Sequence, residues 1–244
     1  MSARPKKWFF LRGLVREAGH WSGFLERFEA AFPDREAIPL EIPGNGKKFR
    51  ERSPLSVAAM TDAVRDEFLA RKGGENHLFA LSLGGMIALD WLHRFPGDVS
   101  SAVLVNTSVR GLSPLTQRLR PANYARIARM FATRDPSYIE RTILEITSTR
   151  RPPGAAEAWL AIHLARPVSS VNAVRQLVAA ARFRPPREKP AVPLLLLNGA
   201  GDRLVNPRCS EALARAWGLP LRVHASAGHD LTLDEPEWVL QQIP

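Results

Sequence analysis

Short apolar runs recur along the chain and alternate with stretches of helical periodicity. Six of the runs have the length of strands, and the run at 77–81 is almost continuously apolar, which is typical of a strand buried on both faces. This alternation predicts an α/β fold with a mostly parallel sheet of about six strands flanked by helices. The predicted strands are Trp8–Leu11, Ala37–Ile42, His77–Leu81, Ser101–Asn106, Val192–Asn198 and Leu221–Ala225.

Helical patterns fill the gaps between the early strands. They cover Trp21–Ala31, Pro54–Ala70 and Leu83–Phe95. Before the second of these, Ser53 precedes a proline, a pair that favours a helix start with Ser53 as the N-cap.

The rhythm changes between about residues 108 and 187, where no strand is predicted. Four helical stretches separated by proline-containing turns follow one another there, and the strand pattern resumes at Val192. We therefore expect residues 1–107 and 188–244 to form one core and residues 108–187 to form a helical cap inserted between two strands. The expected cap helices are Pro114–Ala132, Pro136–Thr147, Gly154–Ala165 and Ser169–Phe183.

The composition is that of an ordinary globular chain, with 244 residues, 45% of them hydrophobic and 24% charged. No apolar stretch is long enough to span a membrane, and Arg12 and Arg16 interrupt the apolar start too soon for a signal peptide. Cys209 is the single cysteine, so an internal disulfide is excluded and a reducing compartment is favoured. We expect a cytoplasmic protein.

The net charge of +10 is concentrated in the predicted cap. Residues 108–187 hold fourteen arginines, no lysine and four acidic residues, so this segment alone carries +10. Arginine-rich helices from GC-rich codon usage would give this pattern. A basic surface that attracts an acidic partner or an anionic substrate would give it equally.

The strongest candidate for chemistry is Ser82, which stands where a buried strand gives way to an amphipathic helix. The residues two before and two after it, Ala80 and Gly84, are small, as a sharp strand-to-helix turn requires. Such a turn lifts the hydroxyl above the sheet edge and places the Leu83 N–H at a helix N-terminus, where it can donate to an oxyanion. An ordinary βα turn in which Ser82 caps the helix would show the same pattern.

The segment Phe79–Met86 resembles the nucleophile elbow, G-x-S-x-G, of the α/β-hydrolase superfamily, with Ala80 in place of the first glycine. In that superfamily an acidic residue follows a late strand. The segment Gly199–Val205 resembles the corresponding G-x-x-D-x-x-V turn and implies that Asp202 is the acid. Asp202 could also be a turn residue that caps the helix expected near Pro207.

A histidine follows the last strand in the same superfamily. The segment Gly228–Pro236 resembles its G-H-x4-D/E-x-P ending and implies that His229 is the general base. His229 would take the proton of Ser82 and return it to the leaving group, while Asp202 holds the imidazole in the right tautomer. The resemblance therefore implies a serine esterase that works through an acyl-enzyme.

The second oxyanion donor of the superfamily follows an H-G pair behind the first central strand. Here that pair is Arg12-Gly13, so the resemblance implies that the Leu14 N–H completes the oxyanion hole with Leu83. Arg12 replaces the usual histidine, and it is either structural or placed near the pocket to favour an anionic substrate. The turn at 41–46 resembles the superfamily's D-x-P-G-x-G turn and is expected to be structural.

The resemblance implies a carboxylic ester or thioester substrate. The small core with a basic helical cap is also similar to pimeloyl-acyl-carrier-protein methyl ester esterases, which makes an acidic acyl carrier protein a candidate partner at the cap. The residues expected to bind substrate or partner are Arg12, Trp21, Arg118, Arg126 and Arg129.

Two other functions stay open at this point. The same fold could carry out a non-hydrolytic reaction, of the lyase or perhydrolase type, or serve as a non-catalytic binding protein. We expect no metal and no cofactor, because the sequence contains no metal-ligand cluster, phosphate loop or dinucleotide motif. Nucleic acid is not expected either, because the basic residues are not interleaved with aromatic ones.

Overall fold

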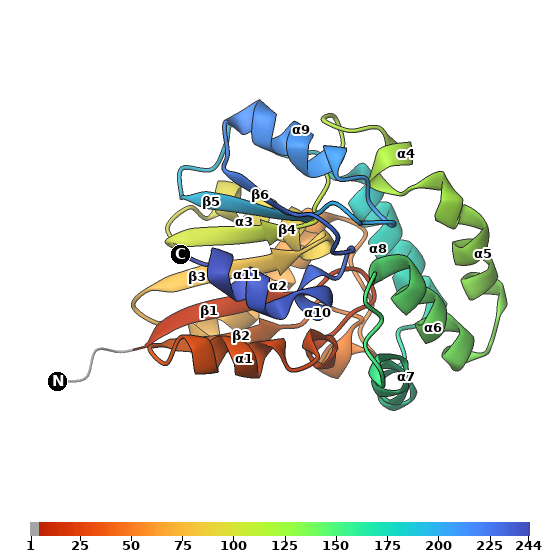
Figure 1. The fold of residues 1–244 in the computed structure, drawn as a ribbon. Helices are drawn as coiled ribbons and strands as arrows, with labels where there is room; N and C mark the ends of the chain where they lie inside the picture. The colour runs from red at the N-terminus through yellow and green to blue at the C-terminus, as the bar shows by residue number, and fades with distance from the viewer. Residues whose placement is uncertain (1–4) are drawn as a thin grey trace.

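The computed structural model describes residues 5–244, and its strands form one sheet of six parallel strands in the order β2-β1-β3-β4-β5-β6 (Figure 1). The predicted sheet is confirmed, and every predicted strand end lies within two residues of an observed one. The strands are β1 Lys6–Leu11, β2 Arg35–Leu40, β3 Asn76–Leu81, β4 Ser101–Val105, β5 Leu194–Gly199 and β6 Leu221–His224.

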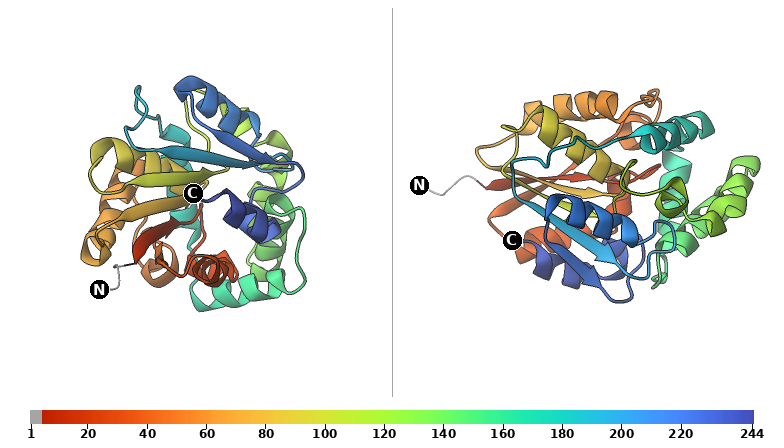
Figure 2. Two further views of the ribbon diagram at one scale, coloured as in Figure 1. Left: turned by 60° about the vertical axis from the view of Figure 1, so that its left-hand side comes forward. Right: turned by 90° about the horizontal axis from the view of Figure 1, so that it is seen from above.

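Side chains of successive strand residues enter two separate apolar cores, one on each face of the sheet. In β1, Phe9 and Leu11 belong to one core, and Trp8 and Phe10 belong to the other. Helices cover both faces, as the views in Figure 2 show, which explains why the strands are apolar on both sides. The first core is covered by α2 Val57–Arg71, α3 Leu83–Arg94 and α9 Arg208–Trp217, and the second by α1 Phe24–Ala31 and α11 Pro236–Gln242.

Two early helices start later than their sequence patterns indicate. The start at Ser53 is wrong, because its hydroxyl donates to the Pro43 carbonyl at 2.7 Å, and α2 begins at Val57 with the Ser56 hydroxyl accepting from the Ala59 N–H at 3.3 Å. The helix expected from Trp21 is also interrupted. A short 3₁₀ turn ends at Trp21, and Ser22 and Gly23 then take positive φ angles of 51° and 81° before α1 begins.

A helical insertion lies between β4 and β5. Three of its helices occur where the sequence predicts them, but the expected helix Pro114–Ala132 is split in two. Arg120 is extended, with φ −65° and ψ 131°, because it precedes Pro121 and the proline ring disfavours a helical residue before it. The helices are α4 Leu115–Arg118, α5 Tyr124–Ala132, α6 Pro136–Thr147, α7 Ala155–Ala165 and α8 Ser170–Arg182.

This insertion covers the edge of the sheet at which the parallel strands end (Figures 1 and 2). Ligands of open parallel sheets bind at that edge, so the insertion encloses the region where function is expected. The chain then completes the core with β5, α9, β6 and the short helix α10 Leu231–Asp234 ahead of α11. None of the helices in residues 5–244 has the length and apolar character needed to cross a lipid bilayer.

The turn at 41–46 connects the core with the insertion. The Asn45 amide donates to the Arg16 carbonyl at 2.9 Å and accepts from the Gln176 amide of α8 at 2.7 Å. Glu41 accepts from the Ala18 N–H at 3.1 Å and packs against Gly46 so closely that a side chain there would collide with its carboxyl group. The turn is therefore held by buried polar contacts, and one of these uses a carboxyl group.

Burial raises the pKa of Glu41 from its ordinary 4.5 to about 7, an effect that the neighbouring Glu17 and Glu67 increase. The folded protein thus holds a proton that the unfolded chain releases near pH 4.5, so this group stabilises the fold at low pH and loses that contribution as pH rises through 7. We predict that Glu41→Gln gains about 2–3 kcal/mol in unfolding free energy, relative to wild type, between pH 5 and pH 8. Urea unfolding at both pH values measures this, and Glu26→Gln, at an exposed position, should show no such gain.

Candidate active site

Ser82 occupies the tight turn between β3 and α3. Its φ of 58° and ψ of −115° lie in a region that side-chain-bearing residues rarely adopt, and its N–H donates to the Val105 carbonyl at 2.9 Å. The turn presses α3 against the end of β1. A Cβ on Gly84 would lie 2.5 Å from the Leu11 carbonyl oxygen and 2.9 Å from that of Arg12, so only glycine fits there.

His229 and Asp202 form a buried pair. Nδ1 of His229 lies 2.7 Å from Oδ2 of Asp202, whose side chain is fully buried. The other carboxylate oxygen of Asp202 accepts from the backbone N–H groups of Leu204 at 2.8 Å and Val205 at 2.9 Å. With Nδ1–H donating to the carboxylate, Nε2 of His229 is the nitrogen left to accept a proton.

Ser82 and His229 line one cavity of about 530 Å³, and Asp202 lies behind His229. The structure thus places the three predicted residues at the ends of β3, β5 and β6. Within residues 5–244 no hydrogen bond joins the Ser82 hydroxyl to His229, and such contacts are commonly long before a substrate is bound.

The cavity wall is mostly apolar, and the insertion supplies much of it. Leu83 and Met86 contribute from the core side, and the cap contributes side chains such as Ile127, Met130, Phe131, Ile143 and Leu177. A chain of polar contacts lies at another part of the wall, where Arg16 bonds to Glu140 at 2.7 Å and Glu140 to His163 at 2.8 Å. Burial would raise the pKa of Glu140, but the charge of Arg16 holds it below its usual value.

Gly13 and Leu83 lie next to the Ser82 hydroxyl. A Cβ built on Gly13 would be 3.6 Å from Oγ of Ser82, so the loop after β1 runs directly past the hydroxyl. Leu14 follows Gly13 in that loop, and its N–H has no acceptor within residues 5–244. Leu83 is the first residue of α3, where backbone N–H groups lack helical partners. Both amides of the expected oxyanion hole therefore flank the cavity.

Asn106 is a site residue that the sequence patterns do not reveal. It follows β4, has a positive φ of 46°, and is almost fully buried. Its amide nitrogen donates to the carbonyls of His229 at 2.7 Å and Gly228 at 3.1 Å, and its amide oxygen accepts from the Gly199 N–H at 3.0 Å. Asn106 thus fixes the histidine loop to the ends of β4 and β5. In the sequence, an asparagine directly after a predicted strand is a signal for a residue with positive φ at this position.

Arg12 forms an ion pair with the residue that follows His229. Its guanidinium makes a two-pronged contact with Asp230, at 3.1 Å and 2.6 Å, and both side chains are almost fully buried. Burial alone would raise the pKa of Asp230, but the charge of Arg12 holds it below its usual value. Although Arg12 lines the cavity, its charge is already paired, so the structural alternative for Arg12 fits its contacts better than binding of an anionic substrate.

The other expected binding residues lie in different surroundings. Trp21 is in the core beneath Arg12, with its ring 4.8 Å from the guanidinium, and does not line the cavity. Arg118 lines the cavity but is buried. Arg126 and Arg129 are exposed on α5, where Arg126 faces Glu145 at 3.9 Å and Arg129 lies over the Tyr138 ring. Within residues 5–244, no group of three or more His, Cys, Asp or Glu side chains is arranged to hold a metal ion.

Comparison with known proteins agrees with this geometry. A sequence model described as the alpha/beta hydrolase family matches residues 9–242. The chain belongs to the α/β-hydrolase family. A comparison with curated protein sequences finds no match.

Solved structures resemble the chain over nearly its whole length. A bacterial membrane phospholipase A has a TM-score of 0.80 at 22% identity, covering 98% of this chain and 77% of its own. A thermophilic esterase from Thermogutta terrifontis has a TM-score of 0.75 at 22% identity, covering 98% and 88%. An esterase from Exiguobacterium antarcticum has a TM-score of 0.78 at 18% identity, covering 98% and 91%. At these identities the likeness establishes the fold.

We predict that Asn106→Asp destabilises the protein, because it replaces a donor to two carbonyls by a buried negative charge beside them. The expected loss in unfolding free energy is about 2–3 kcal/mol, measured by urea unfolding. Asn206→Asp is the matched control, since the Asn206 side chain makes one hydrogen bond within residues 5–244, in which its amide oxygen accepts from the Arg208 N–H at the start of α9. Equal stability of Asn106→Asp and wild type would show that the amide does not hold the histidine loop.

A second prediction concerns the Arg12–Asp230 pair. Arg12→Met or Asp230→Asn alone should cost about 3–5 kcal/mol by leaving one buried charge unpaired, and the double variant should lose at least about 2 kcal/mol less than the two single losses together. The loss in Arg12→Met should shrink as pH falls, because burial then raises the Asp230 pKa and favours the neutral acid. Arg27→Met, in an exposed pair with Glu237, should cost less than about 1 kcal/mol. Additive losses in the Arg12 and Asp230 variants would contradict the coupling.

Proposed function

We propose that this protein is a serine hydrolase that cleaves a carboxylic ester or thioester through an acyl-enzyme. The observation that carries the proposal is the 2.7 Å contact between His229 and Asp202 beside a cavity that also holds Ser82 in a strained turn. A nucleophile, a base and a group that orients the base are the three parts that such chemistry needs.

In the proposed reaction, Oγ of Ser82 attacks the substrate's carbonyl carbon while Nε2 of His229 takes the hydroxyl proton. The resulting oxyanion accepts hydrogen bonds from the Leu14 and Leu83 N–H groups. His229 then gives the proton to the leaving alcohol or thiol, and the carbon–oxygen or carbon–sulfur bond breaks. A water molecule repeats the sequence on the acyl-enzyme and releases the acid. Asp202 stays ionised and stabilises the imidazolium.

The cavity supports an apolar acyl group as the part of the substrate next to Ser82. Side chains of α5, α6 and α8 form a large part of its wall, so we expect the insertion to select the acyl chain. The names of the two esterases and the phospholipase A reported above support ester cleavage as the proposed reaction on this fold. We also propose a cytoplasmic location, on the ground that the one cysteine is a buried thiol.

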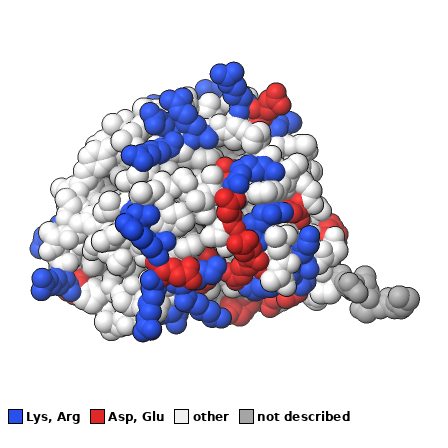
Figure 3. All heavy atoms as spheres, turned by 180° about the vertical axis from the view of Figure 1, so that it is seen from behind, with Lys and Arg blue, Asp and Glu red and all other residues white. Residues whose placement is uncertain are grey.

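An acidic acyl carrier protein at the cap is an extension of this proposal that rests on charge. Part of the cap's charge is used internally, since Arg150 pairs with Glu235 and Arg166 with Glu17. Figure 3 shows blue groups on the cap side with little red among them, so unpaired positive charge remains available to a partner. Salt-insensitive cleavage of a carrier-linked methyl ester, no faster than that of a free short ester, would contradict this partner.

The proposal predicts that a fluorophosphonate probe labels the protein at Ser82 and that Ser82→Ala abolishes the labelling. Ester turnover should fall by about 10⁶-fold in this variant, as in another serine hydrolase that lost its nucleophile. Ser137 on α6 neither lines the cavity nor belongs to the triad, so Ser137→Ala should keep both the labelling and the ester turnover. Near-normal ester cleavage by Ser82→Ala would disprove the mechanism.

The alternative functions give different results in the same experiment. A non-catalytic binding protein takes up no probe. A lyase takes it up but cleaves none of a panel of esters and thioesters that vary in acyl length and charge. A perhydrolase takes it up and transfers the acyl group to added hydrogen peroxide in preference to water. Cleavage of several panel members with a preference for apolar acyl chains is the result expected for the esterase.

A further inference from the structure

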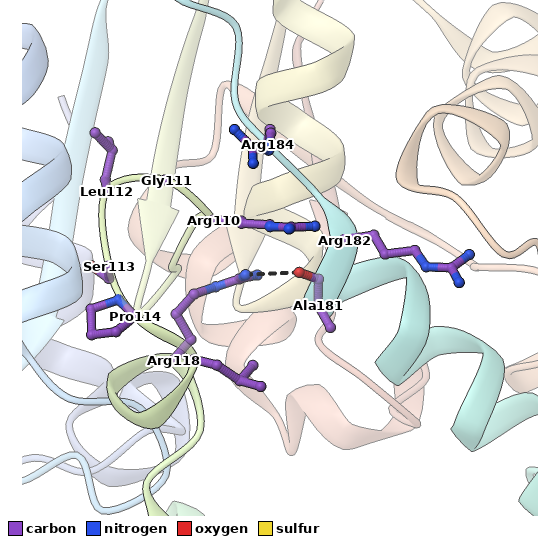
Figure 4. Close-up of a pocket in the computed structure, with 10 residues that line it drawn as sticks. Arg110, Gly111, Leu112, Ser113, Pro114, Arg118, Ala181, Arg182 and Arg184 are labelled. Carbon is purple, nitrogen blue, oxygen red and sulfur yellow. Dashed lines mark hydrogen bonds between the residues drawn. The ribbon is translucent and has the colours of Figure 1, made fainter.

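A second cavity, of about 660 Å³, lies where the insertion joins the core. The loop after β4 forms one wall, and the end of α8 forms the other (Figure 4). The two chain segments are tied together here, because the Arg110 N–H donates to the Phe183 carbonyl at 3.0 Å. Four arginines line this cavity, and we call them the arginine pocket: Arg110, Arg118, Arg182 and Arg184.

The positive charge of the arginine pocket is not balanced within residues 5–244. No acidic side chain is among the residues that line it, and none of its four arginines takes part in an ion pair there. Like charges held together without a counter-charge cost free energy, and an anion bound between them would relieve that cost.

Arg118 is the buried member of the pocket, with 7% of its surface exposed. Its two terminal nitrogens donate to the carbonyls of Ala181, at 3.1 Å, and Ala180, while its Nε has no partner within residues 5–244. Burial lowers the pKa of Arg118, and the charge of Arg110 lowers it further. The guanidinium still stays charged, because the pKa of arginine lies far above neutral pH. A buried cation, whose Nε–H has no acceptor within residues 5–244, therefore lies beside a second cation.

Figure 4 shows how the four side chains lie. Arg110 and Arg118 reach from the β4 side towards the end of α8, with their guanidinium groups side by side, and Arg184 lies next to Arg110 in this view. Arg182 points away from the other three and stands at the edge of the pocket. Arg110 and Arg118 thus bring two guanidinium groups to one region of the pocket, and Arg184 lines the same pocket. A carboxylate has two oxygens, which a single arginine can occupy, whereas a phosphate group offers enough oxygens and charge for several.

The arginine pocket adjoins the cavity that contains Ser82. Leu115, Arg118 and Ala181 line both cavities, so the two share part of their wall. We propose that the arginine pocket binds a phosphate group of the substrate while the ester or thioester of the same molecule reaches Ser82. This rests on the proposed esterase function and adds a substrate class to it, that of acyl esters or thioesters with a phosphate in the alcohol or thiol portion.

Binding of phosphate is tested without any turnover. Inorganic phosphate and pyrophosphate are titrated into wild type, into Arg110→Gln/Arg184→Gln, and into the control Arg134→Gln/Arg141→Gln, whose exposed arginines line neither cavity. Thermal unfolding is followed at constant ionic strength. We expect the anions to raise the Tm of wild type and of the control but not that of the pocket variant. Equal shifts in all three proteins, or no shift in wild type, would overturn the proposal.

Substrate selection is tested with a matched pair of acyl esters, one with a phosphate in the alcohol portion and one with a neutral methylated phosphate. We expect the ratio of their kcat/KM values to favour the phosphate ester in wild type and to fall by about 10- to 100-fold in the pocket variant, as expected for lost charge-assisted hydrogen bonds. The ratio should not change in the control variant. An unchanged ratio in the pocket variant would overturn the proposal.

The phosphate could belong to either of two classes of substrate, and two test substrates distinguish them. One arm uses a dispersed glycerophospholipid, and the other uses a water-soluble acyl thioester of a phosphorylated thiol. The substrate whose cleavage falls in the pocket variant identifies the source of the phosphate. If cleavage of neither substrate falls in the pocket variant, the proposal is overturned. Failure of the esterase function itself looks different, since wild type then cleaves neither ester and takes up no fluorophosphonate, whereas the Tm shift with phosphate persists.

Discussion

The structure depends on one close approach, between the turn that holds Ser82 and the backbone at the end of β1. Gly84 has no room for a side chain because the carbonyls of Leu11 and Arg12 lie against it. The same contact brings the loop after β1 to the Ser82 hydroxyl, which is where the Leu14 N–H is needed. A strained serine and a glycine thus set the distance between the proposed nucleophile and the proposed oxyanion donors.

Around this contact, buried polar groups hold the ends of separate strands together. Asn106 joins the histidine loop to β4 and β5, and Arg12 joins the loop after β1 to Asp230. Polar groups cost free energy when they are buried without hydrogen-bond partners, so each set of contacts is stable only when all of its hydrogen bonds form. This explains why a site assembled from five strand ends can be geometrically defined although loops carry its side chains.

Local patterns in the sequence were enough to predict the strands and most of the cap helices, and to select Ser82, Asp202 and His229, which lie at neighbouring strand ends. They failed where a distant partner decides the outcome. Ser53 has the pattern of a helix cap, but its hydroxyl is taken by the Pro43 carbonyl. Arg12 and Asp230 are separated by 218 positions, so no local pattern reveals their pairing. The sequence gives the net charge of the cap, but it does not show that Arg118 is buried.

Asp234 connects the insertion to the loop that carries His229. Its carboxylate accepts from the Gly228 N–H at 2.7 Å and from the Thr149 N–H at 2.9 Å, so it holds the histidine loop and the chain just after α6 in one network. The Asp230 N–H adds a bond to the Thr147 carbonyl at 2.8 Å. The cap is therefore not an exchangeable module. Replacement of the whole insertion would remove the Thr147 and Thr149 contacts that hold the histidine loop, so single substitutions on the cap's inner face change the cavity with less disturbance of His229.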